Sequence, residues 1–186
     1  MLEQVGGTES MVLGALGAGV VAFLLGLVLC RWLGWVSGWA VAGLVWWLVV
    51  IALVTLVPLD HIDLTIPEDA APTACSTDYG GPAPDGFWLL GGTQRTLNTV
   101  LFVPAGALLV LAAARWRAGW VLVPLGLGLL AAYSVGLELT QLELARIGRA
   151  CDVTDVVDNA AGAAIGVGVG LLLLPVLRPW SVGRTR

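Results

Sequence analysis

The sequence contains no lysine, a single histidine and few charged residues of any kind. Only 12% of its 186 residues are charged, against about 25% in a typical soluble domain. So few charges exclude a disordered chain, a basic nucleic-acid-binding domain and an ordinary cytosolic enzyme. Hydrophobic residues make up 58% of the chain and glycine 25 positions, as expected where helices pack closely in lipid. The composition therefore predicts a small multi-pass membrane protein that binds no nucleic acid.

Five long apolar runs are candidates for membrane-spanning segments. A spanning helix needs roughly 17–25 largely apolar residues, because each residue advances it by about 1.5 Å. The five runs are Met11–Leu29, Trp39–Val57, Leu97–Ala114, Gly119–Leu137 and Val156–Leu177. The predicted fold is therefore all-α, a polytopic bundle of five transmembrane helices.

The arginines predict how this bundle is oriented. Positively charged residues are enriched on the cytoplasmic side of membrane proteins. With the N-terminus outside, every one of the 13 acidic residues falls on the outer side. Six arginines then fall on the cytoplasmic side, namely Arg31, Arg115, Arg117, Arg178, Arg184 and Arg186. We therefore expect the N-terminus outside and the C-terminus in the cytoplasm of a bacterial plasma membrane.

This topology divides the chain into five parts. Residues 1–10 form an outer tail, which differs from a signal peptide because it carries Glu3 and Glu9 and no arginine. Residues 11–58 form a first transmembrane hairpin, 59–94 an acidic, proline-rich outer loop, 95–177 a three-helix core, and 178–186 a basic cytoplasmic tail. The outer loop has no helical or alternating periodicity, which fits either an irregular lid or a solvated linker. Its lone His61 does not define a metal site, and we predict neither a metal nor a cofactor.

The three cysteines differ in their expected environment. Cys30 lies at the cytoplasmic end of the first helix and should be reduced. Cys75 and Cys151 lie in the two outer loops and face an oxidising compartment. We predict a disulfide between Cys75 and Cys151 that ties the long loop to the start of the fifth helix. The alternative is two free thiols.

Polar side chains gather near the outer ends of the third, fourth and fifth helices. The candidate binding residues are Arg95, Asn98, Glu138, Gln141, Arg149, Asp152, Asp155 and Asn159, with Ser134, Arg146 and Asp158 nearby. Glu138 and Gln141 are three apart and share a helix face, as do Asp155 and Asn159, which are four apart. Because charges are costly in lipid, these groups should face the interior of the bundle and pair with one another.

The expected pairing leaves several roles open. Glu138, Asp152 and Asp155 could neutralise Arg95 and Arg149, or the two arginines could grip a phosphate. Glu138 and Gln141 are either ligand-binding or catalytic groups, with Glu138 the candidate general base, or a buried pair that orients Arg149.

Two further polar features of the fifth helix carry expectations of their own. Asp152 is expected to cap this helix, and a divalent cation held by Asp152, Asp155 and Asp158 is the less favoured reading. Asn159 is expected to hydrogen-bond Asn98 and so to link the third and fifth helices.

The motifs of the C-terminal half resemble one known family. The residues that carry the resemblance are Asn98-x3-Phe102-x-Pro104-x-Gly106, Glu138-x2-Gln141, and Arg149-x2-Asp152-x2-Asp155-x3-Asn159-x2-Gly162-x3-Gly166. In order and spacing they are similar to the VanZ-like family of small bacterial membrane proteins, over about residues 95–174. The resemblance implies a role in the cell envelope and an association with glycopeptide (teicoplanin) resistance, and it supplies no reaction. The Gly162–Gly166 motif itself predicts close helix packing within the bundle, with homodimerisation as the alternative.

Three classes of function fit these residues. The first is a membrane protein whose outer-leaflet polar pocket recognises membrane lipids, a lipid-linked cell-wall precursor or a lipoglycopeptide. The second is an enzyme acting on a lipid-linked phosphate or acyl group, with Glu138 as general base and Arg95 and Arg149 stabilising charge. The third is a structural scaffold or small transporter, although no inverted repeat is visible.

Overall fold

Five α-helices account for most of the chain in this computed structural model, which describes residues 7–57, 74–77, 93–143 and 151–179. They are α1 (Thr8–Leu33), α2 (Trp35–Leu56), α3 (Thr93–Ala113), α4 (Gly119–Glu143) and α5 (Val153–Leu177). Each contains a stretch long and apolar enough to cross a membrane. The predicted all-α fold with five spanning helices is therefore confirmed, and the chain is a multi-pass membrane protein.

The helices extend beyond the apolar runs at their polar ends. The largest difference is in α4, which continues six residues past the predicted end at Leu137 to reach Glu143. The added residues include glutamate, glutamine and leucine, which have high helix propensity. Glu138 and Gln141 therefore lie on a helix, and both are buried, so the prediction that they share one face is confirmed.

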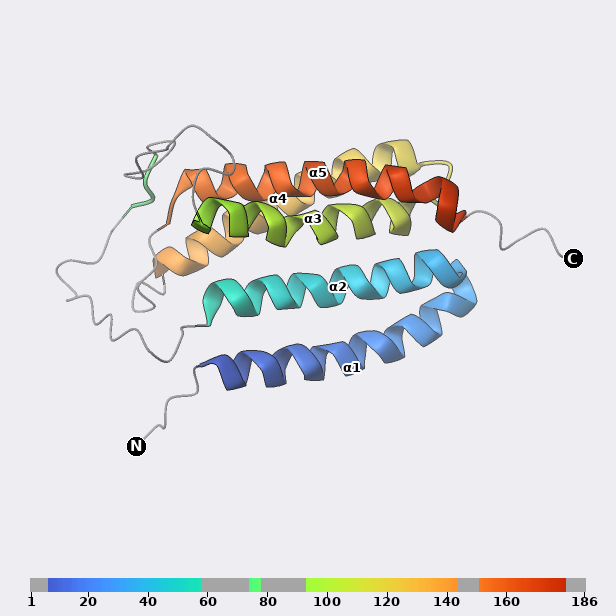
Figure 1. Cartoon of the computed structure of the whole chain (residues 1–186), viewed down its shortest axis with the longest axis horizontal. Helices are drawn as coiled ribbons and strands as arrows, with labels where there is room; N and C mark the ends of the chain where they lie inside the picture. The colour runs from blue at the N-terminus through green and yellow to red at the C-terminus, as the bar shows by residue number, and fades with distance from the viewer. Residues whose placement is uncertain (1–6, 58–73, 78–92, 144–150, 180–186) are drawn as a thin grey trace, which may run out of the picture.

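The bundle consists of a three-helix core and a hairpin beside it. Figure 1 shows α3, α4 and α5 together, with α2 next to them and α1 at the edge. The most extensive contact joins α3 to α5, whereas α1 packs mainly against α2. Because successive helices alternate in direction, α3 and α5 run parallel, and both begin at the end where α4 finishes (Figure 1).

Glycine brings α3 and α5 into backbone contact. A Cβ atom added at Gly162 or Gly166 of α5 would overlap the carbonyl oxygen of Thr99 or Val103 of α3. In the other direction, a Cβ atom on Gly106 would overlap the carbonyl of Ala163. The Gly162–Gly166 motif thus packs within one chain, which confirms the first of its two predicted uses.

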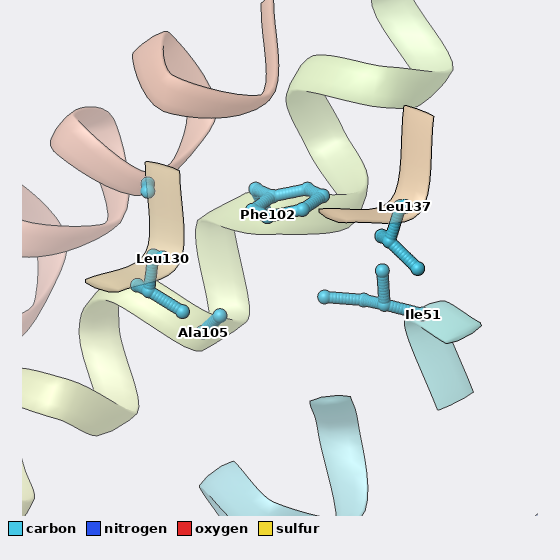
Figure 2. Packing of buried hydrophobic residues seen from close by; sticks show 6 residues of the cluster. Ile51, Phe102, Ala105, Leu130 and Leu137 are labelled. Carbon is cyan, nitrogen blue, oxygen red and sulfur yellow. The ribbon is translucent and has the colours of Figure 1, made fainter. Parts of the chain in front are cut away.

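Apolar side chains from four helices meet in the middle of the bundle. The buried cluster comprises Ile51, Phe102, Ala105, Leu130, Leu137 and Ala163. Figure 2 shows Ile51 of α2 facing Leu137 of α4, with Phe102 of α3 close by. The cluster adjoins the buried polar residues, because Leu130 and Leu137 flank Ser134 on α4 and Ala163 lies one turn after Asn159 on α5.

The disulfide predicted between Cys75 and Cys151 is present, with their Cα atoms 4.6 Å apart. The segments around Cys75 and Cys151 are also joined by backbone hydrogen bonds. The amide of Ser76 donates to the carbonyl of Cys151 at 2.9 Å, and the amide of Val153 donates to the carbonyl of Ser76 at 3.0 Å. Residues 74–77 are therefore fastened to the start of α5. The remainder of the 59–94 loop, His61 included, lies outside the described residues.

Replacing Cys75 or Cys151 with serine should destabilise the protein by about 1–2 kcal/mol. This is less than the usual contribution of a disulfide, because helices inserted in a bilayer are already restricted when unpacked. Thermal unfolding in detergent measures the loss, and on a non-reducing gel the band should shift to the position of the reduced protein. Cys30 is not disulfide-bonded, so Cys30→Ser is the matched control and should change neither readout. An unshifted band for Cys75→Ser would contradict the bond.

Candidate functional site

A set of polar side chains is buried where α3 and α5 begin and α4 ends. It comprises Arg95, Ser134, Glu138, Gln141, Asp155, Asp158 and Asn159. All come from helices that can span a membrane. On α5 they form the first turns of one buried stripe at helical spacing, which continues as small residues from Gly162 to Gly170.

Arg95 of α3 and Asp158 of α5 form a bidentate ion pair. The Arg95 Nε and Nη2 atoms each lie 2.8 Å from one carboxylate oxygen of Asp158. The side chains are 7% and 0% exposed. Sequence reasoning named Glu138, Asp152 and Asp155 as possible partners of Arg95. It did not name Asp158, so it missed the residue that forms the pair.

The register of α3 against α5 explains why Arg95 pairs with Asp158. Gly162 packs on Thr99 and Gly166 on Val103, four residues further along each helix. One step of four towards the N-termini places Asp158 beside Arg95. The charged pair is thus the polar end of the same row of contacts that the glycines form, and the close approach of the backbones holds it in place.

Asn159 hydrogen-bonds α4 rather than α3. Its Nδ2 atom donates to Ser134 Oγ at 2.9 Å, and both residues are buried. The predicted bond between Asn98 and Asn159 is therefore wrong. Asn159 follows Asp158 by one residue, a rotation of about 100° around the helix, and so points to a different neighbour. Within the described part of the chain, its Oδ1 atom is buried and has no hydrogen-bond partner.

Glu138 binds the beginning of α5. Its Oε2 atom accepts a hydrogen bond from the amide of Asp152 at 3.1 Å. Asp152 in turn caps α5, because its Oδ1 atom accepts from the amide of Thr154 at 2.8 Å. The predicted cap is confirmed, and two carboxylates now lie at the positive end of the helix dipole.

Gln141 hydrogen-bonds the C-terminal end of α2. Its Nε2 atom donates to the carbonyl of Thr55 at 2.9 Å, near the C-terminus of α2. The last carbonyls of a helix have no partner within the helix, so this bond satisfies one of them. Gln141 and Glu138 share a face of α4 but bind different elements.

A family model described as VanZ/LLP1 matches residues 20–174 of the chain. The chain belongs to this family. The match is wider than the motifs that suggested it, since it begins within α1 and takes in the hairpin as well as the core. Neither a curated protein nor a solved structure matches the chain.

Several expectations for this VanZ/LLP1 protein concern residues outside the described ranges. Arg146 and Arg149 lie outside the described residues, so the grip of Arg149 on a phosphate and its pairing with Asp152 or Asp155 stay predictions. Asp155 is buried in the first turn of α5. Asn98 is half-buried on α3, three residues after Arg95.

The cation hypothesis has little support in the VanZ/LLP1 site. Across the described ranges, no three His, Cys, Asp or Glu side chains lie where they could hold a metal ion together. Two of the three proposed ligands have other partners, because Asp158 binds Arg95 and Asp152 caps its own helix.

Sequence reasoning missed the contacts in which a side chain binds a backbone carbonyl. The hydroxyl of Tyr133 donates to the carbonyl of Leu48 at 2.6 Å, and Trp47 Nε1 donates to that of Leu101 at 2.8 Å. Both bonds link α2 to the core and position it beside the polar residues. A tyrosine or tryptophan inside an apolar run indicates that its O–H or N–H needs an acceptor. The sequence does not show which backbone carbonyl accepts.

Proposed function

We propose that this protein binds the polar head group of a lipid-linked cell-wall precursor, or of a lipoglycopeptide, at the outer leaflet of a bacterial plasma membrane. Binding takes place over the polar residues of α3, α4 and α5 and lowers susceptibility to glycopeptides. The observation that carries the proposal is the buried set of charged and amide side chains inside membrane-spanning helices. Ionisable groups at such positions are costly and mark functional sites by default.

Stability alone gives no reason to retain this set. A buried ion pair is often replaced by apolar residues of similar volume without loss of stability. The Arg95–Asp158 pair and the Ser134–Asn159 pair occupy positions that leucine or alanine could fill in a packed bundle. These pairs hold Asn159 Oδ1, which has no hydrogen-bond partner among the described residues, in position for a ligand, and this requirement accounts for their presence.

The disulfide supports an outward-facing site. Cys75 and Cys151 are bonded next to Asp152, which caps α5 and whose amide donates to Glu138. Disulfides persist in oxidising compartments, which supports an orientation with this end of the bundle outside the cytoplasm. The distribution of arginines predicts the same orientation. The N-termini of α3 and α5 both face this end (Figure 1). Because Glu138 and Asp152 already bind the start of α5, the positive dipole end of α3 is the one that favours an anionic head group.

The position of Glu138 favours binding over catalysis. A general base must lie within hydrogen-bond reach of the substrate proton, whereas one Glu138 oxygen accepts the amide of Asp152. Its role here is to fix the start of α5. The proposed activity is therefore recognition of a ligand rather than its turnover.

The substitution Asn159→Ala tests the proposal. The full-length protein in nanodiscs is titrated with a fluorescent undecaprenyl-linked cell-wall precursor. Wild-type protein should bind saturably, and Asn159→Ala should bind about ten-fold more weakly, as expected for the loss of about one hydrogen-bonding group. In cells, expression of the wild type should raise teicoplanin resistance and the variant should not.

Gly168→Ala is the matched control, because it lies on the same helix and a Cβ atom there meets nothing within 4 Å. It should bind the probe as the wild type does. Equal affinity of Asn159→Ala and wild type, or no saturable binding by either, would refute recognition of the precursor. Unchanged teicoplanin susceptibility on expression would refute the role in resistance.

A further inference from the structure

An apolar hollow lies between α1 and α2, apart from the polar site. It has a volume of about 240 Å³ and is lined by Gly19, Ala22, Phe23, Trp39, Ala42, Gly43 and Trp46. Every lining residue belongs to the hairpin, and none belongs to the helices that carry the buried charges. We propose that this hollow binds one hydrocarbon chain of a membrane phospholipid as a fixed, non-annular lipid. The inference does not rest on the proposed function.

The walls of the hollow are aromatic rings that pack against α1, where glycine leaves room for them. Trp46 is fixed because its Nε1 atom donates to the carbonyl of Ala15 at 2.9 Å. Trp39 packs against Phe23, with ring centroids 5.3 Å apart, and a Cβ atom on Gly26 would overlap the Trp39 ring. The indoles therefore lie against the backbone of α1 and cannot collapse into the space between them.

The surface that the hollow offers an occupant is almost wholly apolar. The N–H of Trp46 is already bonded, and the N–H of Trp39 is buried out of reach of an occupant, without a hydrogen-bond partner among the described residues. All other lining side chains are glycine, alanine or phenylalanine. Because an unpaired polar group loses free energy in such a site, the occupant must itself be apolar along its length.

The depth and size of the hollow select a lipid chain. Trp39 and Trp46 lie four and eleven residues after the start of α2, or about 6 and 17 Å along the helix. This is the depth of the acyl chains in the leaflet nearest the α1–α2 turn, given a hydrocarbon core of about 30 Å. The volume is below the roughly 300–1,000 Å³ of sites for whole drug-sized ligands, so it takes part of one chain and no head group.

The position of α1 gives a chain access to the hollow. α1 packs mainly against α2 and lies at the edge of the bundle (Figure 1). Its outward residues, such as Val20, Val21 and Leu24, are large, apolar and exposed. In a membrane this surface meets lipid, so an acyl chain can enter from the side.

Photolabelling in vesicles tests the proposal. Full-length protein is reconstituted in phosphatidylethanolamine and phosphatidylglycerol that contain a phosphatidylglycerol with a diazirine at mid-chain. After irradiation, mass spectrometry maps the adducts. We expect adducts concentrated on residues 19–23 and 39–46, about ten-fold above the lipid-facing Leu172, which is 78% exposed, as for a site roughly ten times tighter than annular contact.

Two variants with opposite effects sharpen the result. Ala22→Leu fills the hollow and should lower labelling of residues 39–46 to the annular level, whereas Phe23→Ala widens it and should retain or raise labelling. Gly17→Ala, on the same helix with nothing within 4 Å of an added Cβ atom, should label as the wild type does. If Ala22→Leu fails to fold, the comparison of Phe23→Ala with wild type still decides, since Phe23→Ala must then label no less strongly.

Three outcomes would overturn the proposal. Adducts spread evenly over all lipid-facing residues would mean annular lipid only. Labelling of residues 39–46 that Ala22→Leu leaves unchanged would place the chain elsewhere. Absence of labelling on residues 39–46, together with a dimer in native mass spectrometry, would show that a second copy covers this face instead.

Discussion

Replacing Asp158 with alanine should destabilise the protein by about 3–5 kcal/mol, the cost of leaving one member of a buried ion pair without its partner. Asp158 is fully buried and binds Arg95 through both carboxylate oxygens. Its removal leaves a guanidinium inside a membrane-spanning helix without these two acceptors. Thermal unfolding of the purified protein in detergent measures the loss.

The paired substitution separates the charge from the packing. Arg95→Met combined with Asp158→Leu removes both charges and should recover most of the stability lost in either single variant, because apolar residues of similar volume replace buried pairs well. Glu143→Gln is the control, since Glu143 is an exposed acid on α4, and it should change the unfolding temperature little. If Asp158→Ala were as stable as Glu143→Gln, the ion pair would not hold α3 to α5.

Replacing Gly166 with leucine should cost more than about 3 kcal/mol, beyond the usual range for an overpacked side chain. A Cβ atom at this position already overlaps the carbonyl oxygen of Val103. The obstacle is backbone, which cannot rotate away as a side chain would. α3 and α5 must therefore separate, and the contacts of Gly162 and Gly170 with α3 are lost with them.

Gly168→Leu is the matched control for Gly166→Leu. It introduces the same side chain two residues away on the same helix, where an added Cβ atom meets nothing within 4 Å. Because leucine favours helix over glycine, this variant should be as stable as the wild type or more so. Unfolding followed by tryptophan fluorescence distinguishes the two. Equal stability of the two variants would contradict the close approach of α3 and α5.

These two predictions concern one row of contacts. Arg95 and Thr99 on α3 face Asp158 and Gly162 on α5, and the row continues with the same spacing of four. Separating the helices at Gly166 should therefore also disturb the ion pair. In this way the apolar interface in the middle of the membrane positions the polar groups at its end.

Much of the fold could be predicted from composition and run length. Helices that cross a bilayer must be long, apolar and internally hydrogen-bonded, so five long apolar runs predicted five helices. The disulfide followed from topology, because only Cys75 and Cys151 fall on the same side. The capping role of Asp152 followed from local spacing, since a cap is decided within three residues of the helix start.

The pairing of the polar residues could not be predicted in the same way. Asp158 and Asn159 are adjacent in the sequence but bind α3 and α4 respectively. The spacing of Arg95 from Thr99 matches that of Asp158 from Gly162, but only contact between the two helices reveals which residues are opposite. The bonds of Gln141, Tyr133 and Trp47 to backbone carbonyls are equally hidden, because every residue offers the same acceptor.

The scarcity of charge in this sequence by itself determined a membrane protein with five helices and a polar region near the ends of three of them. That result rests on the free energy of transferring each segment into lipid, which depends on the segment alone. Only the tertiary structure decided that Arg95 pairs with Asp158, that Glu138 holds the start of α5, and that an apolar hollow lies between the two helices of the hairpin. These depend on the relative rotation and register of packed helices, which glycine contacts between different segments fix.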